Sequence, residues 1–395
     1  MIKPSFLLSF ATLSATALEE APKARFEAWT IDSRITVGYG LAIADLDGDG
    51  KLDIFLADSD RTVCYQAPDW RKHILTNKLS AKDHVCLCAA DINGDGKADL
   101  AVGAEWNPGD THHSGAVFHL ESSADCFAPR KAHALHREPT VHRMHWVKED
   151  EGKKHFLAVL PLHGPGNVGG KGEGINFLGY RPSSIPNQDW QTFLIHKGFH
   201  LAHNFDPVSW GETKNESLLV ACLEGVHLLE PKGDSWSATP MTQKGAGEVR
   251  LGRLPNGKRF IVSIEPMHGN EVVINPEHRT ELWSTHRTVI DDTLNQGHAL
   301  VTGDFLGLGY DQVVAGWRNP SRGEKKVGLR LYIPQSENGS SWRLHSTIDD
   351  NQMACEDLKA ADLDGDGDLD LVASGRATKN VIIYWNHCSQ KKEKQ

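Results

Sequence analysis

Short apolar runs alternate with polar turns through most of the chain. Residues 41–58, LAIADLDGDGKLDIFLAD, show the pattern most clearly, with an acidic turn between two apolar runs. Apolar runs of this length, bounded by Gly and Asp, are typical of β-strands, and the turn between them predicts a hairpin. The pattern therefore predicts an all-β fold built from hairpins.

The hairpin pattern repeats along the chain. Clear copies are AADINGDGKADLAVG (89–103) and AADLDGDGDLDLVASG (360–375), and a decayed copy is TGDFLGLGYDQVVAG (302–316). Weaker copies with ordinary polar turns cover residues 142–164, 204–225 and 247–269. Seven units result, which start near Gly38, His84, Thr140, His200, Ala246, Gln296 and Cys355.

Most units also carry a third apolar run and a late run with a Trp, which makes four short strands per unit. A period of about 40–50 residues with four strands per repeat is typical of a β-propeller. We therefore predict a seven-bladed β-propeller over residues 25–387. The seventh unit lacks its last strand, and RFEAWTI (25–31) has the missing pattern. We expect this segment to supply the outer strand of the seventh blade and to close the ring.

The acidic turns have the spacing of a calcium loop. Carboxylates at positions 1, 3, 5 and 9 and a carbonyl at position 7, from Lys51 in the first turn, supply the oxygens that Ca²⁺ prefers. The predicted calcium ligands are Asp45, Asp47, Asp49 and Asp53; Asp91, Asn93, Asp95 and Asp99; and Asp362, Asp364, Asp366 and Asp370. The alternative is an acidic turn without an ion. The turn at Asp304 has Leu in place of two carboxylates, so we expect it to bind no calcium.

This acidic turn with its flanking strands resembles the FG-GAP/VCBS repeat of integrin-like propellers. All the turns join the first and second strands of a unit, so they lie on one face of the disc. Because an ion there neutralises every carboxylate, we expect a structural role for calcium and look for chemistry on the other face.

Polar side chains recur where the chain reaches the opposite face, around the mouth of the central channel. The chain has 21 His, and many fall just before first strands or just after second strands. Recurring imidazoles suit Zn²⁺ or a similar metal and proton transfer near neutral pH. Residues predicted at this mouth include His142, His203, Glu248 and His298 before first strands, and Trp106, His163, Glu224, His268, Trp317, Arg318 and Arg376 after second strands.

Several stretches, among them EPTVHRMHWV, LAVLPLHGPGNVGGKGEG and LAHNFDPVSW, resemble the propeller domain of aldos-2-ulose dehydratases. This resemblance implies a carbon–oxygen lyase that eliminates water or a sugar from a keto-sugar or an oxidised glycoside, with a functional zinc in the propeller. We predict His142, His163, His203 and His298 as catalytic, with His142, His163 and His203 as candidate zinc ligands. Substrate contacts are predicted from Trp106, Glu224, Glu248, His268, Trp317, Arg318 and Arg376. The alternative is a non-catalytic propeller that binds glycan or protein.

Composition narrows the partners and the location. A formal charge of −10 argues against nucleic acid as a partner. Residues 1–17 read as a secretory signal peptide, which predicts a secreted or periplasmic protein, and no later run approaches the roughly 20 apolar residues of a membrane span. We expect residues 388–395 to form a disordered tail. The seven Cys show no CxxC spacing, and we expect most of them to be plain buried residues, with room for one or two disulfides.

Overall fold

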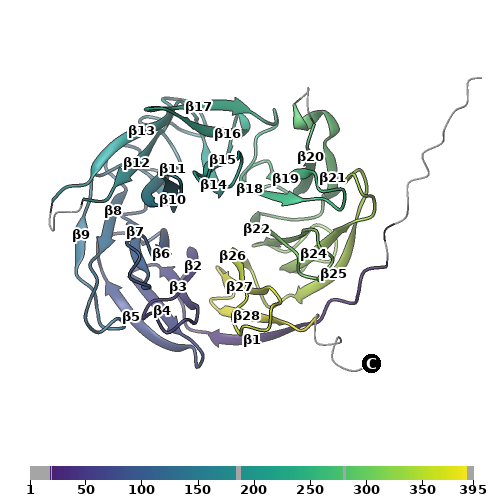
Figure 1. Ribbon diagram of the computed structural model, residues 1–395, viewed down its shortest axis with the longest axis horizontal. Helices are drawn as coiled ribbons and strands as arrows, with labels where there is room; N and C mark the ends of the chain where they lie inside the picture. Colours follow the sequence, from purple (N-terminus) through teal and green to yellow (C-terminus); the bar gives the residue numbers. More distant parts are fainter. Residues whose placement is uncertain (1–17, 19, 184–187, 279–281, 389–395) are drawn as a thin grey trace, which may run out of the picture.

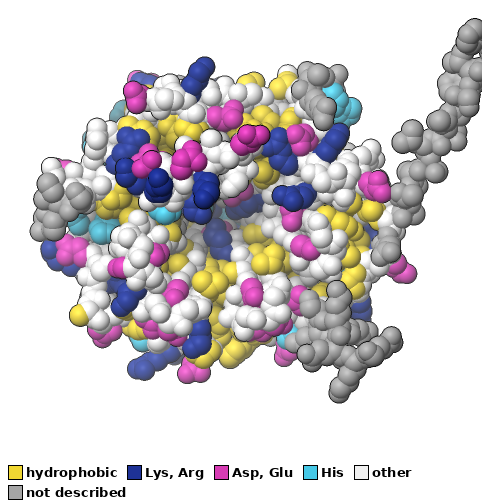
Figure 2. Space-filling model, viewed as in Figure 1, with side chains coloured by type: hydrophobic (Ala, Val, Ile, Leu, Met, Phe, Trp, Pro, Cys, Tyr) yellow, Lys and Arg dark blue, Asp and Glu magenta, His cyan; other side chains and the backbone are white. Residues whose placement is uncertain are grey.

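The computed structural model describes residue 18 and residues 20–183, 188–278 and 282–388. In this part of the chain, seven four-stranded antiparallel sheets stand as blades around a central channel (Figure 1). The space-filling view shows the channel as a hollow at the centre of the disc (Figure 2). The prediction of an all-β, seven-bladed propeller is confirmed.

The first four blades follow the chain in order, and each runs from an inner strand at the channel to an outer strand at the rim. Blade one contains β2 (Gly40–Ala44), β3 (Asp53–Asp58), β4 (Arg61–Gln66) and β5 (Arg71–Asn77). Blade two contains β6 (Cys86–Ala90), β7 (Asp99–Ala104), β8 (Ala116–Leu120) and β9 (Ala132–Ala134). Blade three contains β10 (Val141–Glu149), β11 (Lys154–Pro161), β12 (Asn176–Arg181) and β13 (Gln191–Lys197). Blade four contains β14 (Ala202–Val208), β15 (Ser217–Cys222), β16 (Gly225–Lys232) and β17 (Ser235–Pro240).

The remaining blades continue the pattern, with one short 3₁₀ helix, η1 (Trp283–His286), before the last strand of blade five. Blade five contains β18 (Glu248–Arg253), β19 (Arg259–Glu265), β20 (Glu271–Pro276) and β21 (Thr288–Asp291). Blade six contains β22 (Gly297–Gly303), β23 (Gln312–Trp317), β24 (Gly328–Pro334) and β25 (Trp342–Asp350). Blade seven contains β26 (Cys355–Ala361), β27 (Asp370–Gly375), β28 (Val381–Asn386) and β1 (Phe26–Asp32).

The ring is closed by the N-terminal strand, as predicted. β1 pairs antiparallel with β28, with Phe26 opposite Asn386 and Trp29 opposite Ile383 (Figure 1). Phe26 and Ile31 also pack against the core clusters of the seventh blade. The two ends of the propeller domain are therefore held in one sheet.

Removal of residues 1–32 is expected to lower the midpoint of thermal unfolding by at least about 5 °C, because β28 becomes an unpaired edge and two apolar side chains leave the core. Circular dichroism melting measures the effect. A truncation that ends before residue 24 keeps β1 and serves as the control. Equal midpoints for the two truncations would show that the ring does not depend on β1.

The core lies between neighbouring blades. The second strand of each blade carries an apolar run that is covered on both faces, so that β3 and β23, for example, are buried along their whole length. One cluster joins Phe55 of blade one to Leu100 and Val102 of blade two. Each blade therefore stabilises the next, and the inner strands are fixed around the channel.

The two faces of the disc differ in chemistry. The acidic turns join first to second strands on one face, as predicted, and the inner strands begin at the opposite face. A cavity of about 350 Å³ between the inner strands is lined mostly by apolar residues, with the charged or polar side chains of His145, Asp206, Arg250 and Lys359 among them. The inner strands therefore also carry titratable groups away from the mouth.

All seven Cys lie in the described residues, none is in a disulfide, and all but Cys388 are buried. The expectation that most of them pack as ordinary buried residues is confirmed. The predicted signal peptide, residues 1–17, lies outside the described residues. Residues 389–395 of the predicted tail also lie outside them. In the part of the chain that the structure describes, no helix has the length and apolar character to span a membrane.

Candidate functional site

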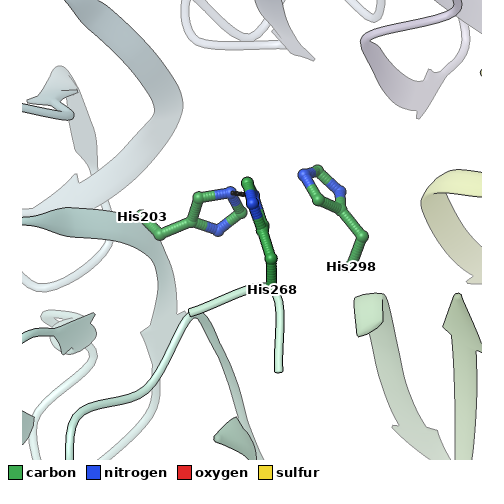
Figure 3. Close-up of side chains that lie close together, drawn as sticks. All are labelled: His203, His268 and His298. Atoms are coloured by element: carbon green, nitrogen blue, oxygen red, sulfur yellow. Dashed lines mark hydrogen bonds between the residues drawn. The ribbon is translucent and has the colours of Figure 1, made fainter. Parts of the chain in front are cut away.

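Three histidines from successive blades converge at the channel mouth. His203 stands on β14, His268 follows β19, and His298 stands on β22 (Figure 3). One ring nitrogen from each lies within 4.8 Å of the others. We call these three residues the histidine triad.

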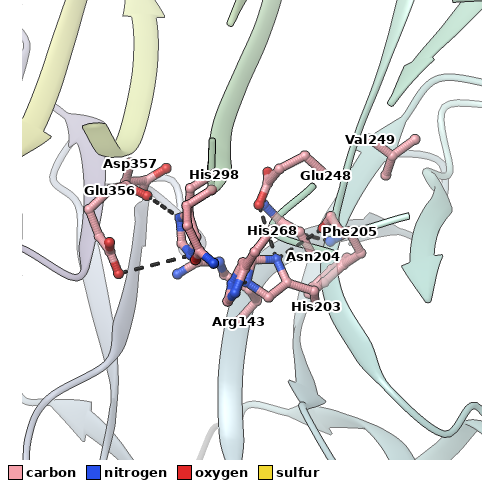
Figure 4. Close-up of polar contacts among 12 residues, drawn as sticks. Arg143, His203, Asn204, Phe205, Glu248, Val249, His268, His298, Glu356 and Asp357 are labelled. Atoms are coloured by element: carbon pink, nitrogen blue, oxygen red, sulfur yellow. Dashed lines mark hydrogen bonds and ion pairs between the residues drawn. The ribbon is translucent and has the colours of Figure 1, made fainter. Parts of the chain in front are cut away.

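The tautomer of His203 follows from its neighbours. Its Nδ1 lies 3.0 Å from the carbonyl oxygen of Gly247 and 3.1 Å from Oε1 of Glu248. Both neighbours can only accept, so Nδ1 carries a proton, which it donates to the carbonyl of Gly247 with the carboxylate of Glu248 close by. Glu248 is fixed in turn by the side-chain amide of Asn204, which donates to its Oε2 at 2.6 Å (Figure 4). The lone pair of neutral His203 is therefore on Nε2, which faces the triad.

His298 is held in the same way. Its Nδ1 donates to the backbone carbonyl of Glu356 at 2.6 Å (Figure 4). The lone pair of neutral His298 is therefore also on Nε2. A histidine whose Nδ1–H is held by a carbonyl or carboxylate is typical of metal ligands, because the bond fixes the ring and its tautomer.

His268 reaches the other two rings from a turn rather than from a strand. Its backbone φ of +52° lies in the left-handed region, which a non-glycine residue rarely adopts. Its Nε2 lies 2.9 Å from Nε2 of His203 and donates a proton to that lone pair. Uncommon backbone conformations of this kind cluster at functional sites.

The rings around the mouth are kept neutral. Burial, with the nearby Arg143, holds the pKa of His142 and of His298 well below the usual value. Burial and the neighbouring His203 and Arg318 lower the pKa of His268 to about 2. These imidazoles therefore keep a free lone pair at neutral pH, as a metal ligand or a base requires.

His142 lies beside the triad. Its ring stacks on Trp106, with centroids 4.9 Å apart, and lies 4.7 Å from the ring of His203. Both of its ring nitrogens are buried and have no partner among the described atoms. An unpaired buried polar group is costly, so this ring is suited to a ligand that completes its hydrogen bonds.

The donor set fits a borderline metal ion. With Nδ1 of His203 and of His298 held by carbonyl oxygens, their Nε2 atoms remain for a ligand, and His268 would join them through Nε2 in its other tautomer. Such a set of three imidazoles is typical of open sites that hold Zn²⁺. The residues differ from the predicted trio, since the triad takes His203 from it and adds His268 and His298.

His163 lies apart from the triad, between blades three and four. It forms a β-bridge with Leu201, and its carbonyl oxygen accepts a hydrogen bond from Thr140 at 2.8 Å. Its ring is half-buried, with Nδ1 buried and unpartnered among the described atoms, and burial lowers its pKa.

Glu224, a predicted substrate contact, is engaged by a histidine that the sequence reasoning did not select. Its Oε1 lies 2.6 Å from Nδ1 of His200, and the backbone N–H of His200 donates to the same oxygen at 3.2 Å. Despite burial, the hydrogen bond from His200 lowers the pKa of Glu224. His200 precedes His203 by three residues, so their Cα atoms lie within about 11 Å. The sequence feature that indicates this pair is a His at the start of the fourth unit together with a Glu after the second strand of the same unit.

Trp317 does not lie at the mouth. It is 1% exposed, its indole N–H donates to the carbonyl of Lys326 at 2.8 Å, and the guanidinium of Arg330 covers its ring. The predicted substrate contact of Trp317 is therefore not available, because its ring has no exposed face. Trp106 is the partly exposed Trp of the pair.

Glu356 joins the triad to two arginines. Arg318 Nη1 donates to its two carboxylate oxygens at 3.0 and 3.3 Å, and Arg376 Nη1 donates to Oε1 at 2.8 Å. The carboxylate of Glu356 is 3% exposed and lies 4.0 Å from Nε2 of His298. The predicted residues Arg318 and Arg376 are thus both placed at the site.

Glu356→Gln is expected to lower the free energy of unfolding by about 3 kcal/mol, because two guanidinium groups lose a buried partner charge. Denaturant titration measures it. Asp150→Asn removes an exposed pair with Lys154 and should leave the unfolding free energy unchanged within error. Equal effects of the two substitutions would contradict a buried ionic hub at Glu356.

The acidic turns fold around a small space on the other face. In the first turn, Asp45 accepts from the N–H groups of Gly48 and Gly50, and Asp53 accepts from Leu46 and Ala67. The bonds that correspond to those from Gly48, Gly50 and Leu46 recur in the second and seventh blades. Carboxylate oxygens gather within 4.8 Å in two of the turns, from Asp45, Asp47 and Asp53 and from Asp362, Asp364 and Asp370.

In the second turn, Asn93 takes the place of one of these carboxylates, and its side-chain amide lies 3.2 Å from Oδ2 of Asp99. In the sixth blade, Asp304 also accepts hydrogen bonds from two backbone N–H groups, those of Leu308 and Gly309, but Leu side chains stand where the other turns have carboxylates.

Family comparisons agree with this architecture. The model of the FG-GAP-like repeat matches residues 45–102, and the model of the FG-GAP repeat matches residues 87–120. The chain carries FG-GAP repeats. Both matches fall in the first two blades, and the predicted resemblance to this repeat is confirmed. A search of curated proteins finds no match.

Solved structures share the fold of this FG-GAP propeller. A chain in a crystal structure of the mitotic checkpoint complex is 12% identical, with a TM-score of 0.55, over 97% of this chain and 99% of that chain. A chain in a crystal structure of BBS1N in complex with ARL6DN, soaked with mercury, is 13% identical, with a TM-score of 0.55, over 93% and 98%. At such identities the similarity concerns the fold alone.

Proposed function

We propose that the protein is a metal-dependent carbon–oxygen lyase that acts on a keto-sugar or an oxidised glycoside at the channel mouth. The histidine triad carries the proposal, because one ring nitrogen from each His lies within 4.8 Å of the others, beside the buried carboxylates of Glu248 and Glu356. The resemblance to aldos-2-ulose dehydratases gives the reaction class. His203, His268 and His298 are the proposed metal ligands.

A bound Zn²⁺ would polarise the substrate carbonyl and so make the neighbouring C–H acidic. His142 is the proposed base, since it is neutral, unpartnered and next to the triad. It takes the proton on the carbon beside the carbonyl, and the released electron pair forms the new C=C bond. Trp106 holds the ring of His142 in place by stacking.

The His200–Glu224 pair is the proposed acid. Because Nδ1 of His200 donates to Glu224, His200 acts as an acid in its imidazolium form, in which Nε2 also carries a proton that can be transferred. When the C–O bond breaks, the departing oxygen takes this proton and leaves as water or as a sugar hydroxyl. No oxidant is needed, since one C–H and one C–O bond are replaced by one C=C and one O–H bond.

We further propose that the three acidic turns bind structural calcium and that the protein is exported. The spacing of oxygens suits Ca²⁺. Residues 1–17 carry the pattern of a signal peptide. These turns lie on the opposite face from the triad, so their calcium takes no part in the reaction.

The test is incubation of the zinc-loaded protein with 1,5-anhydrofructose and a panel of keto-glycosides, monitored by ultraviolet absorbance. A new enone absorbance that is lost with a chelator and in His142→Ala supports the lyase. No product from a folded, zinc-loaded protein would favour the alternative, a propeller that binds glycan or protein without chemistry.

A further inference from the structure

We propose that the site takes a sugar acid, whose carboxylate is bound by Arg318 and Arg376. Beside the triad, a cavity of about 350 Å³ is lined by Gln296, Arg318, Asn319, Arg376 and Ala377. Two of its five lining residues are arginines, and neither neutral sugars nor water requires two guanidinium groups at a small pocket. The binding of a carboxylate by the two arginines does not depend on the proposed lyase activity. Elimination from the bound sugar acid rests on that activity.

Arg318 is fixed in place before any ligand arrives. Its Nη1 donates to both oxygens of Glu356, and its Nη2 donates to Oε1 of Gln296 at 2.6 Å. The side chain is 13% exposed, so it borders the cavity from inside the protein. A guanidinium that is already ordered loses little entropy when an anion binds.

Arg376 approaches the cavity from the next blade. Its Nη1 donates to Glu356 at 2.8 Å, and its guanidinium carbon lies 5.2 Å above the centre of the Tyr39 ring. The side chain is 43% exposed, so the rest of the planar group faces the solvent-filled pocket. Glu356 occupies one edge of the Arg376 guanidinium, and Tyr39 covers one of its faces. The other edge is left to bind a carboxylate through two parallel hydrogen bonds, the geometry that guanidinium groups favour.

The charges around the pocket do not balance. Glu356 offers one negative charge to two arginines. Behind the histidines, Arg143 is accompanied by the buried carboxylates of Glu248 and Asp357, so the excess of positive charge is that of the two pocket arginines alone. A metal ion in the triad would increase the excess of positive charge, so an anionic ligand is favoured.

Glu356 also fixes where the carboxylate lies relative to the reacting atoms. Its side chain holds both arginines, and its backbone carbonyl holds His298. A sugar acid bound at the arginines therefore has its ring directed toward the triad and His142. In such a substrate the acidic C–H is the one beside the carboxylate or an adjacent ketone. Elimination breaks that C–H and the neighbouring C–O bond, forms C=C, and transfers a proton to the leaving oxygen.

The experiment is titration calorimetry of the zinc-loaded protein with glucuronate and with its neutral analogue glucuronamide. We expect glucuronate to bind at least about 10-fold more tightly than the amide, and more weakly as salt is added, since charged hydrogen bonds are lost with the amide. Arg376→Gln should remove this preference, and Arg376→Lys should keep part of it. Arg322→Gln, at an exposed arginine on a neighbouring loop, should have no effect.

Equal binding of glucuronate and glucuronamide, or an unchanged preference in Arg376→Gln, would overturn the anion site. Tighter binding of glucose 6-phosphate than of glucuronate would overturn the assignment to a carboxylate. The two proposals fail separately. Tight glucuronate binding without any elimination removes the lyase and keeps the acid site, whereas elimination from neutral keto-sugars that Arg376→Gln does not change removes the acid site and keeps the lyase.

Discussion

Replacing His298 with alanine is expected to lower zinc affinity by more than about 100-fold and to abolish elimination. Loss of a residue that only supports a ligand costs about 10–100-fold in metal affinity or activity, so loss of a ligand should cost more. Zinc content after dialysis, measured by mass spectrometry, and affinity from competition with a chelating dye check the first part. The ultraviolet assay with keto-sugars checks the second.

His298 is buried on an inner strand, so folding must be measured beside metal binding. His298→Gln keeps much of the side-chain volume and should lose zinc as His298→Ala does, while keeping a melting temperature close to that of the wild type. The control is His113→Ala, since that ring is exposed and lies outside the triad. Full zinc content in a folded His298→Gln protein would exclude the triad as the metal site.

The fold could be predicted because its determinants are local. Each hairpin carries its own turn residues, and the third and fourth strands follow at a regular spacing. Even the closure of the ring was visible, since residues 25–31 have the pattern that the seventh unit lacks. A propeller repeats one hydrogen-bonded unit, so the sequence of a unit is enough to predict it.

The membership of the triad could be predicted only in part. His163 and His268 occupy equivalent places after the second strands of their blades, in Pro-Leu-His-Gly and Pro-Met-His-Gly. His268 has a φ of +52° and meets His203, whereas His163 is not among the described residues with positive φ and bridges Leu201. The direction of a turn side chain depends on backbone dihedral angles, which a motif with three of four residues in common does not reveal.

Trp317 was predicted at the channel mouth but is buried in the core. It ends a second strand, as Trp106 nearly does, but its indole N–H finds the carbonyl of Lys326, and the ring enters the core. Trp106 instead lies two residues beyond the end of β7, and its ring stacks on His142. Trp317 lies within its strand, where the alternation of side chains sets its face, whereas Trp106 lies beyond the end of its strand, where that alternation no longer holds.

Removal of calcium is expected to lower the melting temperature by on the order of 10 °C. Each ion that binds only the folded state adds about 2.7 kcal/mol when its concentration is 100 times its Kd, and three turns have the required spacing. Scanning calorimetry with excess calcium and with a calcium-selective chelator measures the difference. An identical melting curve in both conditions would remove the structural role of the ion.

The effect of the chelator should grow with pH. Burial raises the pKa of Asp53, Asp99 and Asp370 to about 6, and the neighbouring carboxylates add to this for each of them. The folded ion-free protein thus binds more protons than the unfolded chain between about pH 4 and 6, so its stability falls as pH rises through that window. Bound calcium neutralises the charges of these three carboxylates, so the calcium-loaded protein does not lose this stability as pH rises. The gap between loaded and chelated melting temperatures should therefore be small near pH 4 and largest above pH 6.

The sixth blade supplies the matched control for this argument. Asp364 belongs to a group of three carboxylates, whereas Asp304 spends both oxygens on backbone N–H groups in a turn without that group. Asp364→Ala should therefore lower the melting temperature in excess calcium by several degrees and have little effect in chelator, since the lost stability is that of the ion. Asp304→Ala should have the same smaller effect in both conditions, because only hydrogen bonds are lost. Calcium-independent losses of equal size would mean that both turns are held by hydrogen bonds alone.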